Sequence, residues 1–490
     1  MRNILAVCAA LVLIGLGVFL LERSRAGLEI LDLRVGDTPA TLMQRPGAVG
    51  PVVVIAHGFA GSRQLMHPYQ ITLARAGYLT VSFDFQGHGR NPVPMSGDVN
   101  ALDGTTQLLM AEMGRVTDAA LALDGADGRV ALLGHSMASD IVVRQALADP
   151  RVEAVVAVSL FSRAVTDKAP MNLLAINGAW EGALRAEARR IMAEVGAQEG
   201  ETTGHPGKGF ARRAVAAPMA EHVGVLYSGT GLAEARDWLN LTFDRGHDSD
   251  EATIGGPILL TLIGVVLLGL PLAQIMPAGH APPEIPPGAF WTLAIAPAIL
   301  TPLVLSPFRT QILPVLVADY LALHLALYGG LVLVGLTLIG RVPKRAGWWA
   351  GLVLAGFGLL AFGGMLDRYV ASFYPHTGRL PILAAILPGA VLAMVADAAL
   401  LQAGHARMWR RLAVRLAVLA SLGLAVALNP ERLFFLVLIL PVIALFYFSF
   451  GVIGGAVGRR MGSVMAMGLG LGVILAWALS VTFPLFQGAV

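Results

Sequence analysis

The second half of the chain is a series of long apolar runs, and this feature constrains the fold more than any other. A soluble core cannot bury so many apolar segments in so short a stretch, whereas a bilayer core of about 30 Å accepts one helix of roughly 20 residues for each run. We therefore expect residues 254–490 to form an all-α polytopic membrane domain of about eight helices. The runs lie near residues 254–276, 288–306, 312–340, 347–366, 380–402, 411–428, 432–456 and 461–484.

Another apolar run begins the chain. Ile4 to Leu21 is an uncharged stretch of 18 residues that follows Arg2, and it is just long enough to cross a bilayer. A cleaved signal peptide is the alternative, but no small-x-small cleavage pattern closes the run. We expect residues 1–27 to be an uncleaved transmembrane anchor.

The charges divide unevenly along the chain. Residues 1–253 hold 22 Lys+Arg and 27 Asp+Glu, whereas residues 254–490 hold 13 and 5. The basic residues of the second part lie between apolar runs, where they set membrane orientation and do not indicate binding to nucleic acid. The single cysteine, Cys8, allows no intrachain disulfide.

Loop charge predicts the orientation of the spans. If the N-terminus is cytoplasmic and every run crosses, more basic residues fall in the inner loops than in the outer loops. We therefore expect an integral protein of a bacterial inner membrane whose soluble part is periplasmic. The inner residues are Arg341, Lys344, Arg345, Arg407, Arg410, Arg411, Arg459 and Arg460, and the outer ones are Arg309, Arg368, Arg379 and Arg432.

Residues 28–246 have the pattern of a soluble α/β domain, and residues 247–253 form an acidic linker after it. Short β-rich runs alternate with helical stretches and with Gly, Asp and Pro turns, which favours a mostly parallel sheet. We expect strands at 28–35, 52–56, 79–84, 129–133, 152–159, 171–176 and 211–217, and helices at 64–76, 105–122, 137–148, 183–195 and 230–241.

A nucleophile pattern follows one of these strands. Gly134-His135-Ser136-Met137-Ala138 comes directly after an apolar run and before a helical stretch. Small residues at both ends let the strand and the helix approach closely, so that the serine hydroxyl stands clear of both. Ala138 replaces the usual last glycine and adds one methyl group. A serine held in this way usually has a histidine directed at it.

Two further strands end in sharp polar turns. His57-Gly58-Phe59 follows the buried strand 52–56, and Asp84-Phe85-Gln86-Gly87-His88-Gly89 follows the next strand. A glycine-rich turn beside a nucleophile can expose a backbone N–H to a developing oxyanion. His57, His88 and Asp84 are interpreted as structural residues that hold these loops.

In this order, the three segments resemble the α/β-hydrolase superfamily, in the branch of monoacylglycerol-lipase-like and esterase-like serine hydrolases. The resemblance covers about residues 28–246. It implies an α/β-hydrolase fold in which the N–H groups of Phe59 and Met137 form the oxyanion hole. The chain has no P-loop, no G-x-G-x-x-G after a strand, no CxxC and no HExxH, so we expect no cofactor and no metal.

The family's chain order is nucleophile, acid, histidine. Glu181 follows the strand 171–176 and takes the place of the acid, with Asp167 as the alternative. His222 lies between the last strand and the last helix and takes the place of the general base. His247 and His205 fit this place less well.

The segment between strands 152–159 and 171–176 is too short for the lid domain that many relatives insert there. We therefore expect a pocket that is either open or covered by something else, and our hypothesis is that the membrane domain or the bilayer surface covers its mouth. Within the apolar runs, Asp319, His324 and Asp397 are expected to be embedded, whereas Asp367 and His405 fall at run ends. Embedded ionisable residues suggest a proton path, although helix–helix contacts explain them at least as well.

The sequence thus predicts a membrane-bound serine hydrolase. Its partners would be the lipid bilayer and a small-molecule or lipid ester, and its site Ser136, His222 and Glu181. The alternative is a transporter or a membrane scaffold that carries an accessory or inactive hydrolase domain. No pattern in the chain predicts the oligomeric state.

Overall fold

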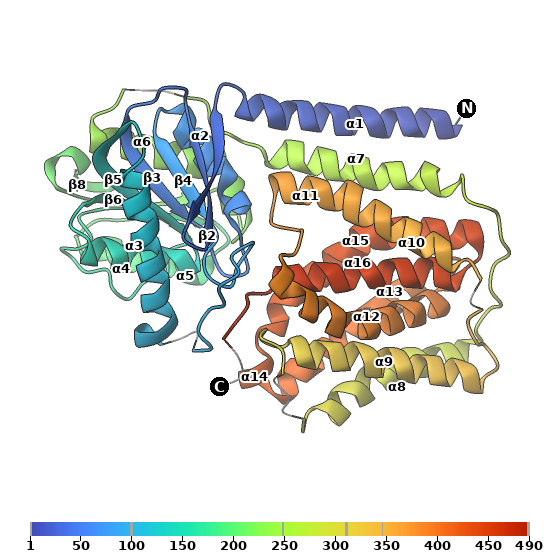
Figure 1. Cartoon of the computed structure of the whole chain (residues 1–490). Coiled ribbons are helices and arrows are strands. Elements are labelled where there is room, and N and C mark those ends of the chain that lie inside the picture. The colour runs from blue at the N-terminus through green and yellow to red at the C-terminus, as the bar shows by residue number, and fades with distance from the viewer. Residues whose placement is uncertain (1, 99–100, 247–248, 309–311, 345, 488–490) are drawn as a thin grey trace.

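The computed structural model describes residues 2–98, 101–246, 249–308, 312–344 and 346–487. An α/β part lies beside a bundle of long helices (Figure 1). Three residues named above, His247, Arg309 and Arg345, lie outside the described residues.

A nine-stranded sheet forms the centre of the α/β part within the described residues. Its order is β1-β2-β4-β3-β5-β6-β7-β9-β8, and all neighbours from β4 to β9 are parallel. The mostly parallel sheet confirms the predicted fold class, whereas β2 and β8 were not predicted. The strands are β1 (Glu29–Val35), β2 (Thr38–Gln44), β3 (Gly50–Ala56), β4 (Leu79–Phe83), β5 (Ala126–His135), β6 (Val152–Val158), β7 (Asn172–Gly178), β8 (Thr202–His205) and β9 (Phe210–Ala217).

Helices cover both faces of this sheet. Side chains of α2 (His67–Arg75) and α6 (Gly229–Phe243) pack on one face, and those of α3 (Gln107–Leu121), α4 (Met137–Ala148) and α5 (Gly182–Ala193) pack on the other. A short 3-10 turn, η1 (Arg63–Met66), precedes α2. The central strands are largely apolar because they are buried on both faces; every residue of β3 and β7 is buried.

Nine helices of the described residues are long and apolar enough to cross a membrane. This architecture is that of an integral membrane protein. The helices are α1 (Arg2–Arg25), α7 (Gly255–Ala273), α8 (Pro287–Leu305), α9 (Ala318–Leu338), α10 (Trp348–Phe357) continued through a π turn into α11 (Gly363–Tyr369), α12 (Leu380–Leu400), α13 (Met408–Leu428), α15 (Leu436–Met461) and α16 (Val464–Thr482), with the short α14 (Pro430–Leu433) before α15.

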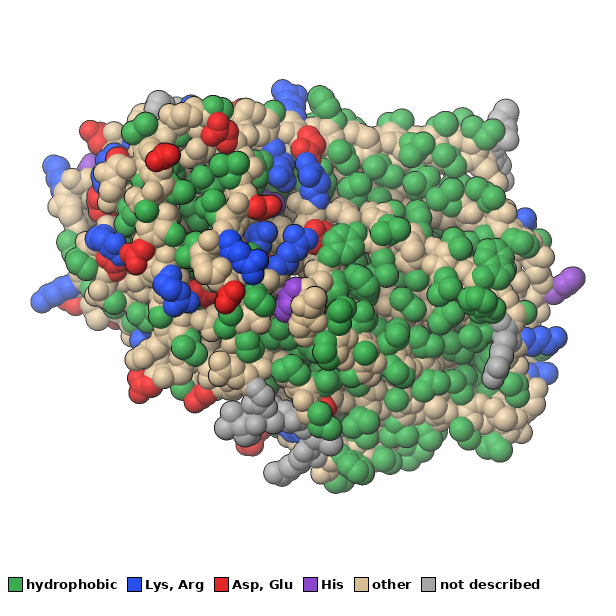
Figure 2. Space-filling model, in the orientation of Figure 1, with side chains coloured by type: hydrophobic (Ala, Val, Ile, Leu, Met, Phe, Trp, Pro, Cys, Tyr) green, Lys and Arg blue, Asp and Glu red, His purple; other side chains and the backbone are tan. Residues whose placement is uncertain are grey.

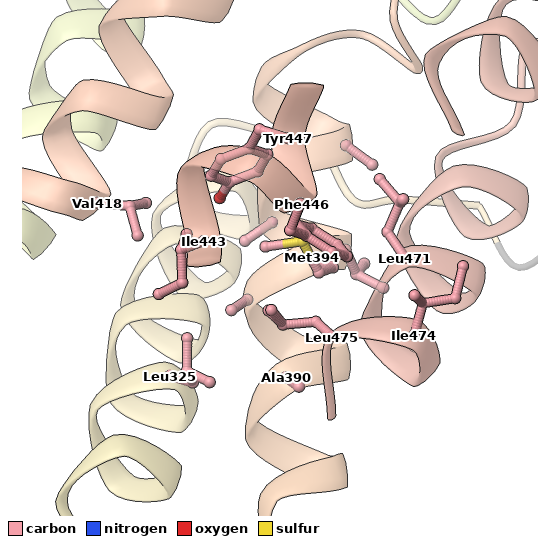
Figure 3. Close-up of a cluster of buried hydrophobic side chains, with 14 of the residues drawn as sticks. Leu325, Ala390, Met394, Val418, Ile443, Phe446, Tyr447, Leu471, Ile474 and Leu475 are labelled. Atoms are coloured by element: carbon pink, nitrogen blue, oxygen red, sulfur yellow. The ribbon is translucent and has the colours of Figure 1, made fainter. Parts of the chain in front are cut away.

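Small residues allow the central helices of the bundle to pack closely. A side chain at Gly329 of α9 would meet the Ala393 backbone of α12 at 2.5 Å, and one at Gly468 of α16 would meet Val395 at 2.5 Å. Apolar side chains from α9, α12, α13, α15 and α16 fill the space between these helices (Figure 3). The helices of the bundle therefore associate through close van der Waals contact. Such contact is expected because lipid gives no hydrophobic driving force between helices.

Polar contacts join the α/β part to the bundle. The buried guanidinium of Arg379 donates to the carbonyl oxygens of Gly87 at 2.9 Å and Ser480 at 3.1 Å. Beyond α16 the chain returns to the α/β part, where Leu485 N–H donates to the Gly87 carbonyl at 2.8 Å. Met95 N–H in turn donates to the Leu485 carbonyl at 2.7 Å. These bonds fix the bundle against the loops that follow β4.

The two chain ends lie at opposite ends of the bundle. The N-terminal end of α1 is far from the α/β part, and the C-terminal end of the chain lies beside it (Figure 1). This arrangement agrees with an odd number of crossings, so the α/β part and the C-terminus share one side. The loops on the other side hold Arg341, Lys344, Arg407 and the last turn of α15 with Arg459 and Arg460.

Candidate active site

Ser136 stands on a strained turn between β5 and α4. Its backbone is at φ 55° and ψ −117°, a conformation that non-glycine residues adopt only when the surroundings impose it. A Cβ at Gly134 would lie 2.4 Å from the Ala138 carbonyl oxygen, so this position requires glycine. Ala138 itself is fully buried and fits with its single methyl group. The turn thus places the Ser136 hydroxyl at the carboxyl edge of the sheet, partly exposed.

The three predicted site residues are joined by hydrogen bonds. His222 Nε2 lies 2.8 Å from Ser136 Oγ, and His222 Nδ1 lies 2.5 Å from Glu181 Oε1. An ionised carboxylate only accepts hydrogen bonds, so Nδ1 carries the proton and Nε2 is free to accept one from the serine. The imidazole is about half exposed, with 45% of its side-chain surface accessible, whereas only 4% of the Glu181 side chain is.

The Glu181 carboxylate is held by two further donors. Its Oε2 accepts from Gly178 N–H at 2.5 Å and from the Ser159 hydroxyl at 3.0 Å. Burial raises the pKa of this carboxyl, but the hydrogen bonds from His222, Gly178 and Ser159 outweigh it, so that the pKa lies below its usual value. Glu181 is therefore ionised at neutral pH and oriented toward the imidazole.

The two N–H groups predicted for the oxyanion hole border the serine. Met137 is the first residue of α4, so its N–H has no partner within the helix. Phe59 follows Gly58, where a Cβ would lie 2.8 Å from Ser136 Cβ. Among the hydrogen bonds of the described residues, neither N–H donates to another group of the chain. Both remain free for an oxygen bound at Ser136.

The part of the chain that matches known proteins is the α/β part. Residues 51–194 match the family model described as alpha/beta hydrolase fold. The α/β part has the α/β-hydrolase fold. We refer to it below as the hydrolase part; the fold supports a hydrolase activity.

Similar solved structures include three hydrolytic enzymes. They are dienelactone hydrolase from Anabaena variabilis ATCC 29413 (20% identity, 43% of this chain and 96% of that chain, TM-score 0.32), epoxide hydrolase VrEH1 from Vigna radiata (22% identity, 27% and 39%, TM-score 0.22) and a thioesterase domain from the curacin biosynthetic pathway (25% identity, 27% and 46%, TM-score 0.22). The match thus spans 39% of the length of the Vigna radiata enzyme. The search of the curated proteins found no match.

The alternative acid and base residues do not join this site. Asp167 is exposed in the loop between β6 and β7 and makes no hydrogen bond to His222. His205 ends β8 at the sheet edge, where its Nδ1 accepts from Gly207 N–H at 3.2 Å. His247 lies outside the described residues. Within the described ranges, no group of three or more His, Cys, Asp or Glu side chains could hold a metal ion.

Three other polar residues hold the surrounding loops. His57 Nε2 accepts from Phe85 N–H at 3.1 Å, and His88 Nδ1 lies 2.8 Å from the Gln86 carbonyl oxygen. Both imidazoles are buried, and burial lowers the pKa of each. Asp84, also buried, accepts from the Arg63 guanidinium at 2.7 Å. These contacts agree with the structural roles expected for His57, His88 and Asp84.

Two residues that position the site were not predicted from the sequence. One is Ser159, whose hydroxyl reaches Glu181. The other is His135, whose Nε2 lies 2.9 Å from the His222 carbonyl oxygen. Burial and the neighbouring His222 lower the pKa of His135 to about 4, so it is neutral and donates this bond. Ser159 directly follows β6, and the shared carboxyl edge of parallel strands is the signal that could have found it.

The membrane bundle reaches the rim of this site. The ring of Phe435, just before α15, lies 5.2 Å from the ring of Phe59 between centroids. Leu316, which precedes α9, packs against the apolar core of the hydrolase part, and Phe486 is part of that core. The bundle therefore contacts the loop that holds Phe59.

The ionisable residues predicted within the membrane have different surroundings. His324 is buried, with its Nε2 3.1 Å from the Ser421 hydroxyl, and Asp397 is buried without a hydrogen bond to either carboxylate oxygen. Asp319 is not embedded as expected, because α9 begins only at Ala318. It lies in the first turn and accepts from the backbone N–H groups of Ile312 and Leu313. Asp367, which was expected at the end of an apolar run, contacts the hydrolase part, where it pairs with Arg90 at 2.5 Å.

Proposed function

We propose that the protein is a membrane-bound serine hydrolase that cleaves an ester-like bond through an acyl-enzyme intermediate. The observation that carries this proposal is the continuous relay from Ser136 through His222 to Glu181, beside two free backbone N–H groups. A serine hydroxyl is a weak nucleophile at neutral pH, and a base within hydrogen-bond distance is what activates it.

The relay accounts for the first half of the reaction. Ser136 Oγ attacks the carbonyl carbon while its proton passes to His222 Nε2, and the carbonyl π electrons move to the oxygen. The N–H groups of Phe59 and Met137 stabilise this oxyanion. The imidazolium is stabilised by Glu181, which keeps its charge throughout. As the carbonyl re-forms, the bond to the leaving alkoxide breaks and His222 gives its proton to that oxygen.

The second half repeats these steps with water. His222 Nε2 removes a proton from a water molecule, whose oxygen attacks the acyl carbon on Ser136. The same N–H groups stabilise the second oxyanion. Ser136 then leaves as its alkoxide and regains the proton from His222, so that the acid product is released and the site returns to its starting state.

Apolar side chains around the site favour a lipid or another apolar ester as the substrate. Met219 and Val223 flank His222 and are 81% and 46% exposed, and Phe161, near the start of α4, is 56% exposed. Exposed apolar side chains that gather around a site are typical of a surface that meets an apolar partner such as lipid. Ser136 would therefore take its substrate from the bilayer or from the bundle surface.

The hydrolase part is proposed to lie on the extracytoplasmic side of a bacterial inner membrane. The loops at the opposite end of the bundle carry most of the basic loop residues, and such loops remain in the cytoplasm. A membrane-impermeant fluorophosphonate probe tests side and activity together. We expect labelling of intact spheroplasts, equal labelling after lysis, no labelling of Ser136→Ala, and unchanged labelling of the control Ser96→Ala.

Each other result has a definite meaning. Labelling only after lysis would reverse the orientation and leave the enzyme proposal intact. No labelling of the folded wild-type protein on either side would contradict the enzyme proposal and favour a membrane scaffold with an inactive hydrolase domain. Labelling that survives in Ser136→Ala would show that Ser136 is not the nucleophile.

A further inference from the structure

A cavity lies apart from Ser136, at the junction between the hydrolase part and the membrane helices. It has a volume of about 690 Å³ and lies between the ends of α1 and α11 on one side and β1, β2 and η1 on the other. Figure 2 shows basic and acidic side chains gathered at this junction, next to the largely apolar surface of the bundle. Because two membrane-length helices end here, the cavity lies at the level of the lipid headgroups.

Four arginines line this cavity, and one of them has no partner. The paired ones are Arg90 with Asp367 at 2.5 Å, Arg368 with Glu22 at 2.8 Å, and Arg63 with Asp84 at 2.7 Å and Asp32 at 3.7 Å. The side chain of Arg25, the last residue of α1, makes no hydrogen bond or ion pair within the described part of the chain, although it is partly buried. A guanidinium that is shielded from water and unpaired is costly unless an anion joins it.

The pKa of a histidine in the cavity wall is lowered by burial and by the neighbouring arginines. His67 is 5% exposed and lies at the start of α2. Burial and, after it, the charges of Arg25, Arg63 and Arg368 together lower its pKa to about 3, with no acidic residue opposing them. The field at this point is therefore positive despite the three carboxylates of the lining. His67 is neutral at neutral pH and has both a donor and an acceptor to offer.

We propose that this cavity binds the phosphate group of an anionic ligand, with Arg25 as its principal contact. Guanidinium groups match phosphate oxygens with paired N–H donors, and basic pockets between membrane helices are typical binding places for anionic headgroups. The volume is in the range of ligand pockets. A phospholipid headgroup and free phosphate share this chemistry. The position of the cavity, beside the ends of two membrane-length helices, favours the headgroup. The proposal does not depend on the Ser136 site.

The test uses the full chain in nanodiscs of phosphatidylcholine, with or without phosphatidylglycerol. Native mass spectrometry measures which lipid stays bound, and the thermal unfolding midpoint measures the stabilisation. We expect phosphatidylglycerol to be retained in preference to phosphatidylcholine, and Arg25→Gln to reduce this preference about tenfold, as for the loss of one charge-assisted hydrogen bond. The matched control is Arg23→Gln, which removes the same charge two residues away on an exposed position outside the cavity.

Two further variants separate binding from folding. Arg25→Lys keeps the charge and should keep most of the preference. Glu22→Gln frees Arg368 from its ion pair and should strengthen the preference for phosphatidylglycerol. If the cluster had a purely structural role, the same variant would only weaken this preference. In a separate arm, inorganic phosphate is added to phosphatidylcholine nanodiscs at constant ionic strength.

The outcomes decide whether the site exists and which phosphate-bearing ligand occupies it. A phosphatidylglycerol preference that Arg25→Gln loses and Arg23→Gln keeps, with no effect of inorganic phosphate, supports a headgroup site. Stabilisation by inorganic phosphate that Arg25→Gln abolishes supports a site for free phosphate. Equal behaviour of Arg25→Gln and Arg23→Gln in both arms would overturn the proposal.

Discussion

Replacing Glu181 with Gln should remove nearly all activity without unfolding the hydrolase part. In the wild type, one carboxylate oxygen serves Gly178 N–H and the Ser159 hydroxyl, and the other serves His222 Nδ1. The amide oxygen of Gln can replace only the first of these. Its NH₂ group then faces Nδ1, and the imidazole must move its proton to Nε2, the atom that should accept the Ser136 proton.

The expected loss follows from this change of tautomer. Replacing a triad acid with its amide lowers kcat about 10⁴-fold, which corresponds to about 5 kcal/mol of barrier. The assay is hydrolysis of a short nitrophenyl ester by the purified full-length protein, with kcat and KM measured separately. The matched control is Asp167→Asn, which also removes one carboxylate, but from the exposed loop. A Glu181→Gln variant that keeps more than about a tenth of the activity, or an Asp167→Asn variant that loses as much as Glu181→Gln, would contradict the role of Glu181.

Three further predictions test the surroundings of the site. The hydrogen bonds that lower the pKa of Glu181 despite its burial stabilise the fold at neutral pH, and this stabilisation disappears as the pH falls through the folded-state pKa. The difference in unfolding temperature between the wild type and Glu181→Gln should therefore narrow as the pH is lowered. A difference that stays constant with pH would contradict this prediction. Gly58→Ala places a Cβ 2.8 Å from Ser136 Cβ and should lower kcat about 10²–10³-fold in a folded protein by displacing the oxyanion loop; near-normal kcat would refute this placement. Phe435→Ala removes the ring contact with Phe59 and should raise KM for long-chain esters about fivefold through loss of about 1 kcal/mol, whereas the exposed neighbour Phe434→Ala should not. Equal KM values would argue against a role of the bundle at the site.

The elements that carry the site could be predicted because their signals are local. A strand, a tight turn with Gly134 and Ser136, and a helix follow one another within a few residues. The places of Glu181 and His222 followed from the family's chain order, since the carboxyl ends of parallel strands meet at one edge of a sheet. The structure brings these three side chains together across 86 positions of the chain.

The features that were missed depend on contacts between distant segments or on weak local patterns. β2 contains Pro39 and no regular alternation of apolar residues, and β8 has only four residues, so neither gives a clear strand signal. The contact of Phe435 with Phe59 joins residues from different domains and has no sequence signature. Asp319 was placed wrongly because Pro314 and its neighbours are apolar but precede the helix, which starts later than hydropathy suggests.

Trapping of the acyl-enzyme is the most direct measurement of the proposed chemistry. Rapid mixing with an activated ester should give a burst of leaving group equal to the enzyme concentration, and digestion of the quenched protein should give a single acylated peptide that contains Ser136. The burst and the adduct should disappear in Ser136→Ala, and both should form very slowly in His222→Gln. Hydrolysis without any acylated peptide, or an adduct on another residue, would contradict it.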